Sequence, residues 1–239
     1  MKKRFDRIVS LGSFCSVAME LEKKGLREAS YPFDWMISDR LEEILHLMQN
    51  DFADFLNPAF IHSEHRKEVC FNEKTGMHFY HDFNGNDTIE AQIPALKEKY
   101  ERRIRRFYSD ISSPTLFVRY CIRPEDEEYI RNKREAILKY LKTFNSENSI
   151  LYVFSGGRNE LMTDESEVLG FECTIRQPEN DFVRGWIDAV PGLSAFLYSS
   201  LSPGPLRILR NILICYRKKL IRKIGHMTNK FLLRSHIGR

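Results

Sequence analysis

The chain has 239 residues, 42% of them hydrophobic and 29% charged, which excludes extensive disorder and supports one domain, or one domain with an appendage. Ten of the 37 basic residues and none of the 33 acidic ones follow Asp188, so residues 1–188 carry a net charge of −6 and residues 189–239 carry +10. Five cysteines without a CxxC pair argue against a disulfide framework or a zinc ribbon and favour a reducing, cytoplasmic compartment.

Neither a signal peptide nor a membrane span is expected. The basic residues 1–7 lead into a strand pattern rather than a long apolar core. No stretch reaches the roughly 18 consecutive apolar residues that a spanning helix needs. We therefore expect residues 1–190 to form one α/β domain and residues 191–239 to form a basic helical tail.

Residues 7–21 read as a strand, a glycine turn and a helix, with Cys15 in the first turn of that helix. Free backbone N–H groups and the positive end of the helix dipole favour a thiolate there. Because a thiolate is a nucleophile, Cys15 is a candidate catalytic residue; the alternative is a small buried hydrophobic side chain. Gly25 is expected to end this helix in a C′ position.

Three features are predicted between residues 31 and 83. Residues 31–35 are expected to be extended, with Asp34 between two aromatic residues, and Asp39 can cap the helix that follows. The stretches 69–72 and 77–83 alternate on either side of a short turn, which predicts an inserted β-hairpin. On its second strand His81 shares the apolar face of the neighbouring residues Met77, Phe79 and Phe83.

The second half of the domain alternates between helix and strand patterns. Helices are predicted from about Pro94 to Tyr108 and from Pro124 to about Phe144, and strands over 115–120, 150–154 and 171–175. This order indicates a mostly parallel α/β sheet flanked by helices. Ligands of such sheets bind beyond the carboxyl ends of the strands, so Gly12 to Cys15, Arg119 and residues 155–157 should lie along one rim.

The leading catalytic hypothesis pairs Cys15 with His81, because a cysteine nucleophile needs an imidazole that holds the ion pair and protonates the leaving group. Asp34 is preferred over Asp82 as the third member, since Asp82 should point to the opposite strand face from His81. The alternatives are a core imidazole for His81 and a turn-capping role for Asp34.

Four further residues are candidates for substrate binding: Ser13, Ser16, Trp35 and Arg119. The N–H groups of Cys15 and Ser16 could bind an oxyanion. Arg119 is the charged residue of an otherwise apolar strand, so it could clamp a carboxylate or phosphate; a structural salt bridge to the acidic segment after Pro124 is the alternative.

No metal and no cofactor are expected. Five potential ligands lie within twenty residues: His62, His65, Cys70, His78 and His81. If residues 77–83 form a strand, His78 and His81 project to opposite faces and cannot bind one ion together. The glycines near the strand ends match neither a Walker loop nor the dinucleotide fingerprint.

Four blocks of sequence resemble a bacterial family of largely uncharacterised proteins described as putative papain-like cysteine peptidases. The blocks are Asp6 to Ala18 with its Ser-Leu-Gly-Ser-x-Cys turn, Leu26 to Trp35 with Pro-Phe-Asp-Trp, Phe79 to Phe83, and Leu116 to Arg119. The resemblance implies a cysteine nucleophile at Cys15 and a histidine at His81, and hence a thiol-dependent hydrolase that acts on peptides.

The resemblance leaves two alternatives. Papain-like enzymes set the histidine on an antiparallel sheet, whereas parallel spacing dominates this chain, and the turn before Cys15 also looks like the nucleophile turn of Gly-Asp-Ser esterases. An ester or sugar substrate, with cofactor-free acyl or glycosyl transfer in surface polysaccharide metabolism, is therefore one alternative. The other is a non-catalytic binding or scaffold protein.

The tail is predicted to be a basic amphipathic helix over about residues 205–234. Apolar residues recur at spacings of three and four, with arginines and lysines between them: Leu206, Leu209, Leu213, Tyr216, Leu220, Ile224, Met227 and Phe231. Such a helix could adsorb to the anionic inner face of a membrane, or it could pack on its own domain or a twin. Nucleic acid is disfavoured because aromatic residues are too sparse to form a stacking platform.

Overall fold

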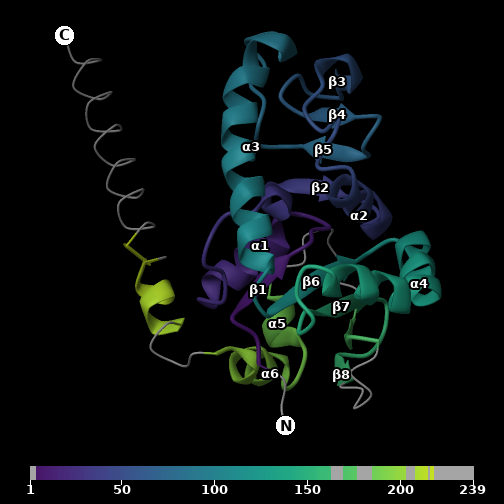
Figure 1. Ribbon diagram of the computed structural model, residues 1–239, viewed down its shortest axis with the longest axis vertical. Coiled ribbons are helices and arrows are strands. Elements are labelled where there is room, and N and C mark those ends of the chain that lie inside the picture. Colours follow the sequence, from purple (N-terminus) through teal and green to yellow (C-terminus); the bar gives the residue numbers. More distant parts are fainter. Residues whose placement is uncertain (1–3, 163–168, 177–184, 203–207, 215, 218–239) are drawn as a thin grey trace, which may run out of the picture.

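The computed structural model describes residues 4–162, 169–176, 185–202, 208–214 and 216–217 (Figure 1). Its main sheet has five strands in the order β1-β6-β7-β9-β8, in which β1, β6, β7 and β9 are parallel and β8 runs antiparallel at the edge. Their bounds are β1 Arg7–Ser10, β6 Thr115–Cys121, β7 Ser149–Ser155, β8 Glu160–Met162 and β9 Phe171–Ile175. The predicted α/β class with a mostly parallel sheet is confirmed, and β8 makes the sheet mixed.

Helices cover both faces of the main sheet. Alternate strand residues such as Ile8 and Val118 pack with α1 (Cys15–Lys23), α5 (Trp186–Ala189) and α6 (Leu193–Ser200). The other residues, such as Val9 and Phe117, face a second core with α2 (Leu41–Gln49), α3 (Ile89–Ile111) and α4 (Pro124–Lys142). The predicted end of α1 is confirmed, because Gly25 follows it with a φ of +70°.

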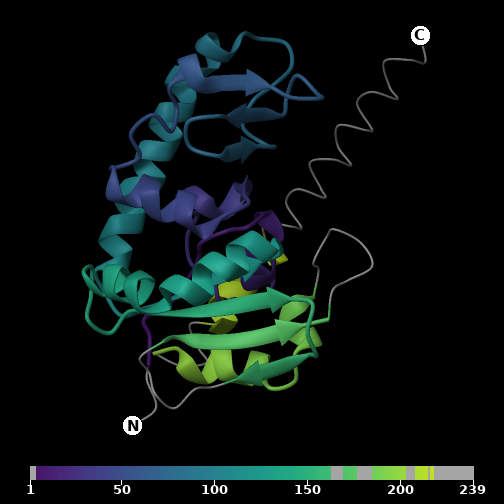
Figure 2. The same ribbon diagram turned by 90° about the vertical axis from the view of Figure 1, so that its right-hand side faces the viewer.

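A smaller antiparallel sheet has the order β2-β5-β4-β3. Its strands are β2 Met36–Ser38, β3 Ile61–Ser63, β4 Cys70–Asn72 and β5 Met77–Phe79. Figure 2 shows this sheet above the main one, with α3 running alongside both and α2 between them. The strand pair expected as an inserted hairpin is thus half of a four-stranded sheet, and its second strand ends at Phe79 rather than at residue 83.

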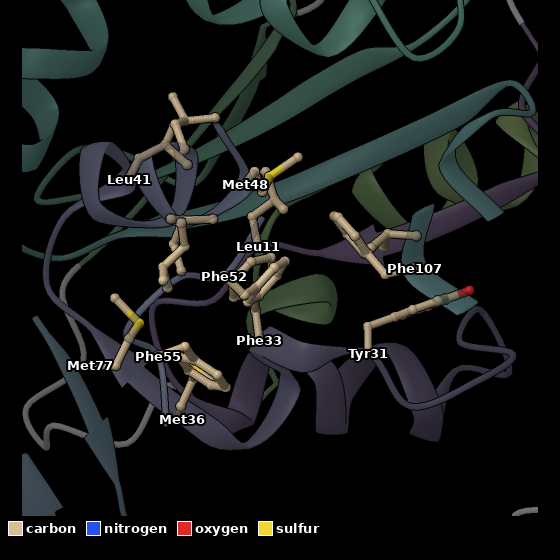
Figure 3. Close-up of a cluster of buried hydrophobic side chains, with 14 of the residues drawn as sticks. Leu11, Tyr31, Phe33, Met36, Leu41, Met48, Phe52, Phe55, Met77 and Phe107 are labelled. Atoms are coloured by element: carbon tan, nitrogen blue, oxygen red, sulfur yellow. The ribbon is translucent and has the colours of Figure 1, made fainter. Parts of the chain in front are cut away.

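Aromatic side chains fill the core between the small sheet and α3 (Figure 3). The Phe33 ring stacks on Phe52 at 5.5 Å between centroids and meets Phe107 edge-on at 5.6 Å. The Tyr31 hydroxyl reaches the edge of this core and donates to Asp110 Oδ2 at 2.8 Å. This core holds residues 31–36 firmly against α3.

Three local predictions were wrong in detail. Residues 32–35 form a short 3₁₀-helix, η1 (Pro32–Trp35), rather than an extended stretch, because Asp34 accepts a hydrogen bond from the Tyr31 N–H at 2.8 Å. Arg40, not Asp39, precedes the first residue of α2. α3 begins at Ile89, five residues before Pro94, where the Thr88 hydroxyl accepts from Ala91 N.

The boundary predicted at residue 190 falls between α5 and α6. Leu193 and Leu197 of α6 have no exposed surface. At the end of α6, the Phe5 N–H donates to Ser200 O and the Ser202 N–H donates to Phe5 O, both at 2.7 Å. Residues 208–214 and 216–217 of the predicted tail are helical, and the rest of the predicted 205–234 helix lies outside the described residues.

Candidate functional site

A glycine turn connects β1 to α1, as the sequence predicted, and places Cys15 at the first position of the helix. Gly12 has a φ of +80°, and a Cβ atom there would lie 2.9 Å from Ser38 Oγ, so the turn requires glycine. The Phe14 side chain makes no capping bond to α1. Helix geometry leaves the first N–H groups of α1 without intrahelical partners, and they point toward the Cys15 end.

The Arg119 side chain, on β6, is hydrogen-bonded to this turn. All five of its N–H donors are used: Nε and Nη2 bond Asp126 Oδ2 at 3.0 and 2.8 Å, Nη1 bonds Leu11 O and Ser38 Oγ, and Nη2 bonds Ser38 O. Asp126 in turn accepts from Leu41 N at 2.6 Å, at the start of α2. One guanidinium therefore connects β1, β2, α2 and α4.

The four candidates for substrate binding have different environments in the structure. Arg119 has no exposed surface, so it forms the structural salt bridge that was the alternative to a substrate clamp. The buried Ser13 hydroxyl donates to Ser38 O at 3.2 Å and also holds the turn. Ser16 is buried, and its hydroxyl has no hydrogen-bond partner among the described residues. Trp35 is half-buried.

Cys15 differs from the other described cysteines in being partly exposed. Cys70, Cys121 and Cys173 are buried. Burial raises the pKa of the Cys70 and Cys121 thiols and raises that of Cys173 to about 12, so these three remain protonated at neutral pH. Among these four cysteines, the thiol at the helix N-terminus is thus the one that solvent can reach.

His81 does not lie on the inward face of a strand, as its spacing predicted. It is exposed and follows the end of β5, in a bend of the chain. Its ring meets the Trp35 ring edge-on at 6.3 Å between centroids. Trp35 ends η1, which packs against α1, so η1 adjoins both the helix that carries Cys15 and the bend that carries His81.

Asp34 is turned toward Arg27 rather than toward His81. Its Oδ2 accepts from Arg27 Nε at 2.9 Å, from Arg27 Nη2 at 2.8 Å and from Tyr31 N at 2.8 Å. Burial raises the pKa of Asp34, and the Arg27 charge and the Tyr31 N–H oppose that rise. The carboxylate therefore caps η1, as the turn-capping alternative had it, and the catalytic role of Asp34 stays a prediction.

The other acidic candidate is also engaged elsewhere. Asp82 accepts from the Tyr100 hydroxyl at 2.8 Å and pairs with Lys99, both on α3. These bonds turn the chain away from β5 after Phe79. They are the physical reason that the strand alternation stops before His81.

Sequence reasoning missed two pairs of a histidine with a carboxylate. His62 Nε2 lies 3.4 Å from Glu73 Oε2, and both side chains are exposed. His78 Nδ1 lies 3.2 Å from Glu64 Oε2, and the His78 ring lies 4.5 Å from the Phe71 ring. Glu64 is fourteen residues away along the chain, and only the pairing of β3, β4 and β5 brings it close. Across the described ranges, no group of three or more His, Cys, Asp or Glu side chains is arranged to hold a metal ion.

The fold and this site define an α/β protein with an accessible cysteine at the carboxyl edge of a parallel sheet. Residues 6–152 match the family described as "Putative papain-like cysteine peptidase (DUF1796)", and because the match spans more than half of the chain, this protein belongs to that family. An uncharacterized protein of Acanthamoeba polyphaga mimivirus is 28% identical over 206 residues, which cover 76% of this chain and 82% of the viral one. This relative is viral, so the comparisons do not support the expected restriction to bacteria. No solved structure matches.

Proposed function

We propose that this protein is a thiol-dependent hydrolase of peptide bonds, with Cys15 as nucleophile and His81 as general base and acid. The supporting observation is the position of Cys15: a partly exposed thiol at the N-terminus of a nine-residue helix, beside buried and protonated cysteines elsewhere. A helix N-terminus stabilises the thiolate, and this family membership agrees with such chemistry.

The proposed reaction has two steps. The Cys15 thiolate attacks the scissile carbonyl carbon, and the carbonyl electron pair moves to oxygen, where the N–H groups of Cys15 and Ser16 stabilise the oxyanion. When the carbonyl re-forms, the C–N bond breaks and protonated His81 gives its proton to the leaving amine. Water, deprotonated by His81, then attacks the thioester, which releases the acid and restores the ion pair.

Trp35 is proposed to bind the substrate beside the reacting atoms. The Arg27 guanidinium carbon lies 5.5 Å from the centroid of the Trp35 ring, and the His81 ring meets it edge-on. The buried pair of Asp34 and Arg27 holds the backbone of η1, which carries the indole. An apolar or aromatic side chain next to the cleaved bond suits this ring.

The experiment that tests the proposal compares hydrolysis by the full chain and by Cys15→Ala across peptide, ester and nucleotide-sugar libraries. Met19→Ala is the matched control, since Met19 is exposed one turn further along α1. We expect peptide cleavage that Cys15→Ala abolishes and Met19→Ala retains. Cleavage that persists in Cys15→Ala contradicts the proposed nucleophile, and turnover of sugar or ester substrates alone contradicts the peptidase assignment.

A further inference from the structure

The described part of the tail is a helix with two apolar sides, formed by residues 208–214 and 216–217 and here called the tail helix (yellow in Figure 1). Its first apolar side touches the turn after α1. A Cβ atom at Gly25 would lie 2.6 Å from Ile212 Cγ1 and 2.7 Å from Ile208 O, and Asn211 Nδ2 donates to Gly25 O at 3.1 Å. The tail helix therefore packs directly on Gly25.

The second apolar side of the tail helix is turned away from Gly25. Leu209 and Leu213, four residues apart, are 54% and 60% exposed, and the exposed Tyr216 follows three residues later. At about 100° per residue these side chains share one stripe, and Ile208 and Ile212 lie to one side of it. The stripe is the one that the sequence pattern continues through residues 220, 224, 227 and 231, and more than half of the surface of Leu209 and of Leu213 is exposed.

Basic residues flank the exposed stripe. Arg210 and Arg217 are exposed on the side opposite to Ile208. Residues 189–239 carry +10 without an acidic residue, whereas residues 1–188 carry −6. The positive charge is therefore concentrated in the C-terminal part of the sequence, and the described part of that segment exposes Leu209 and Leu213.

We propose that the tail helix docks on an anionic lipid bilayer, with the Leu209–Leu213 stripe inserted between headgroups and the arginines on the phosphates. A bilayer surface satisfies both features, because it offers an apolar interior beneath negative charge. A second copy of the chain would bring a second tail of +10 to the same face, and the two tails would repel each other. Nucleic acid offers phosphates but no apolar partner for the leucines.

The first test is sedimentation of the full chain with vesicles of phosphatidylcholine alone and with vesicles that contain about 30% phosphatidylserine. We expect binding to the anionic vesicles only, and at least tenfold weaker binding when the salt concentration rises from about 0.1 to about 0.5 M. Equal binding to neutral vesicles, binding that does not respond to salt, or no binding at all overturns the proposal.

The second test uses paired substitutions in the full chain. Leu209→Ser with Leu213→Ser should weaken binding at least tenfold, and Arg210→Gln with Arg217→Gln should weaken it about 25-fold, which is about fivefold for each charge. The control is Met19→Ser with Met162→Ser, which removes two apolar side chains that are 43% and 42% exposed elsewhere on the surface. The affinity of the control double variant for anionic vesicles should lie within about twofold of that of the unaltered chain.

Two outcomes assign the stripe to another partner. A dimer in solution that Leu209→Ser with Leu213→Ser dissociates, together with no vesicle binding, shows that a second copy covers it. Salt-dependent binding of an oligonucleotide, together with no vesicle binding, shows that the basic residues serve nucleic acid. Either result overturns the proposal, and neither bears on the chemistry at Cys15.

Discussion

Arg119 and Asp126 form an ion pair in which neither side chain has exposed surface, with Arg119 Nη2 2.8 Å from Asp126 Oδ2. The remaining donors of Arg119 bond Leu11, which precedes the turn that leads to Cys15, and Ser38 of β2, which accepts from Ser13 of that turn. The pair joins the start of α4 to that turn. The position of the thiol therefore depends on a buried charge that does not touch solvent.

Replacing Arg119 by lysine should destabilise the fold strongly. Lysine lacks the planar fork of five donors, so Asp126 would remain buried with a poorly placed partner. Breaking a buried pair costs about 3 to 5 kcal/mol, and we expect a loss of this size in the free energy of unfolding, measured with urea. Arg102→Lys, in an exposed pair with Glu98, is the control and should change it by less than about 1 kcal/mol. Equal losses in the two variants would contradict the role of Arg119.

Comparing the stability of Gly12→Ala with that of Gly192→Ala separates the cost of steric contact from the cost of backbone strain. Gly12 and Gly192 share a φ of +80°, but a Cβ atom at Gly192 meets nothing within 4 Å, whereas one at Gly12 meets Ser38 and Arg119. We expect Gly192→Ala to cost about 1 to 2 kcal/mol from the left-handed conformation alone. Gly12→Ala should cost about 1 to 3 kcal/mol more because of overpacking, as measured by chemical unfolding. If the two variants are equally stable, the turn is not tightly packed.

Truncation should locate the end of the folded domain. A chain that ends at residue 190 loses Leu193, Phe196 and Leu197, each worth about 1.5 to 3 kcal/mol when buried. This loss is comparable with a typical total stability of about 5 to 15 kcal/mol, so we expect this chain to be unfolded by circular dichroism. A chain that ends at residue 202 keeps α6 and the Phe5 pairing and should unfold cooperatively. A folded 1–190 chain would contradict this expectation and would support the boundary predicted at residue 190.

The predictions that succeeded depended on local patterns. The strand, glycine turn and helix around Cys15 follow from a short apolar run, one glycine and a helical spacing, all within twenty residues. The parallel strands at 115–121 and 149–155 follow in the same way from buried runs separated by a helix with a proline start.

The predictions that failed depended on contacts between distant segments. His81 was placed by extending the alternation of β5, but Asp82 bonds Tyr100 on α3 and ends the strand first. The ion pair of Asp34 with Arg27 also became visible only in the fold, and the catalytic role of Asp34 stays a prediction. No local spacing gives the position of Ser38 beside Arg119, since these residues are 81 positions apart.

The three buried cysteines provide an internal reference for the reactivity of Cys15. The pKa of Cys173 is raised to about 12, so its thiol stays protonated below that pH and should react with iodoacetamide only as the pH approaches that value. Burial also raises the pKa values of Cys70 and Cys121, so these thiols should likewise react with iodoacetamide more slowly than Cys15 at neutral pH. Peptide-resolved mass spectrometry after alkylation reports each site separately. Rapid labelling of Cys173 at neutral pH would contradict the buried core described above.

The most direct test of the proposed function is the pH dependence of Cys15 alkylation in the full chain, in His81→Gln and in His78→Gln. We predict a midpoint well below the ordinary thiol value of about 8.5. His81→Gln should raise that midpoint by at least about one unit, because the imidazolium partner is lost. His78→Gln should leave it unchanged, since His78 is engaged with Glu64. A Cys15 as inert as Cys173, or a midpoint that His81→Gln does not move, would contradict the assignment of Cys15 and His81 as the catalytic pair.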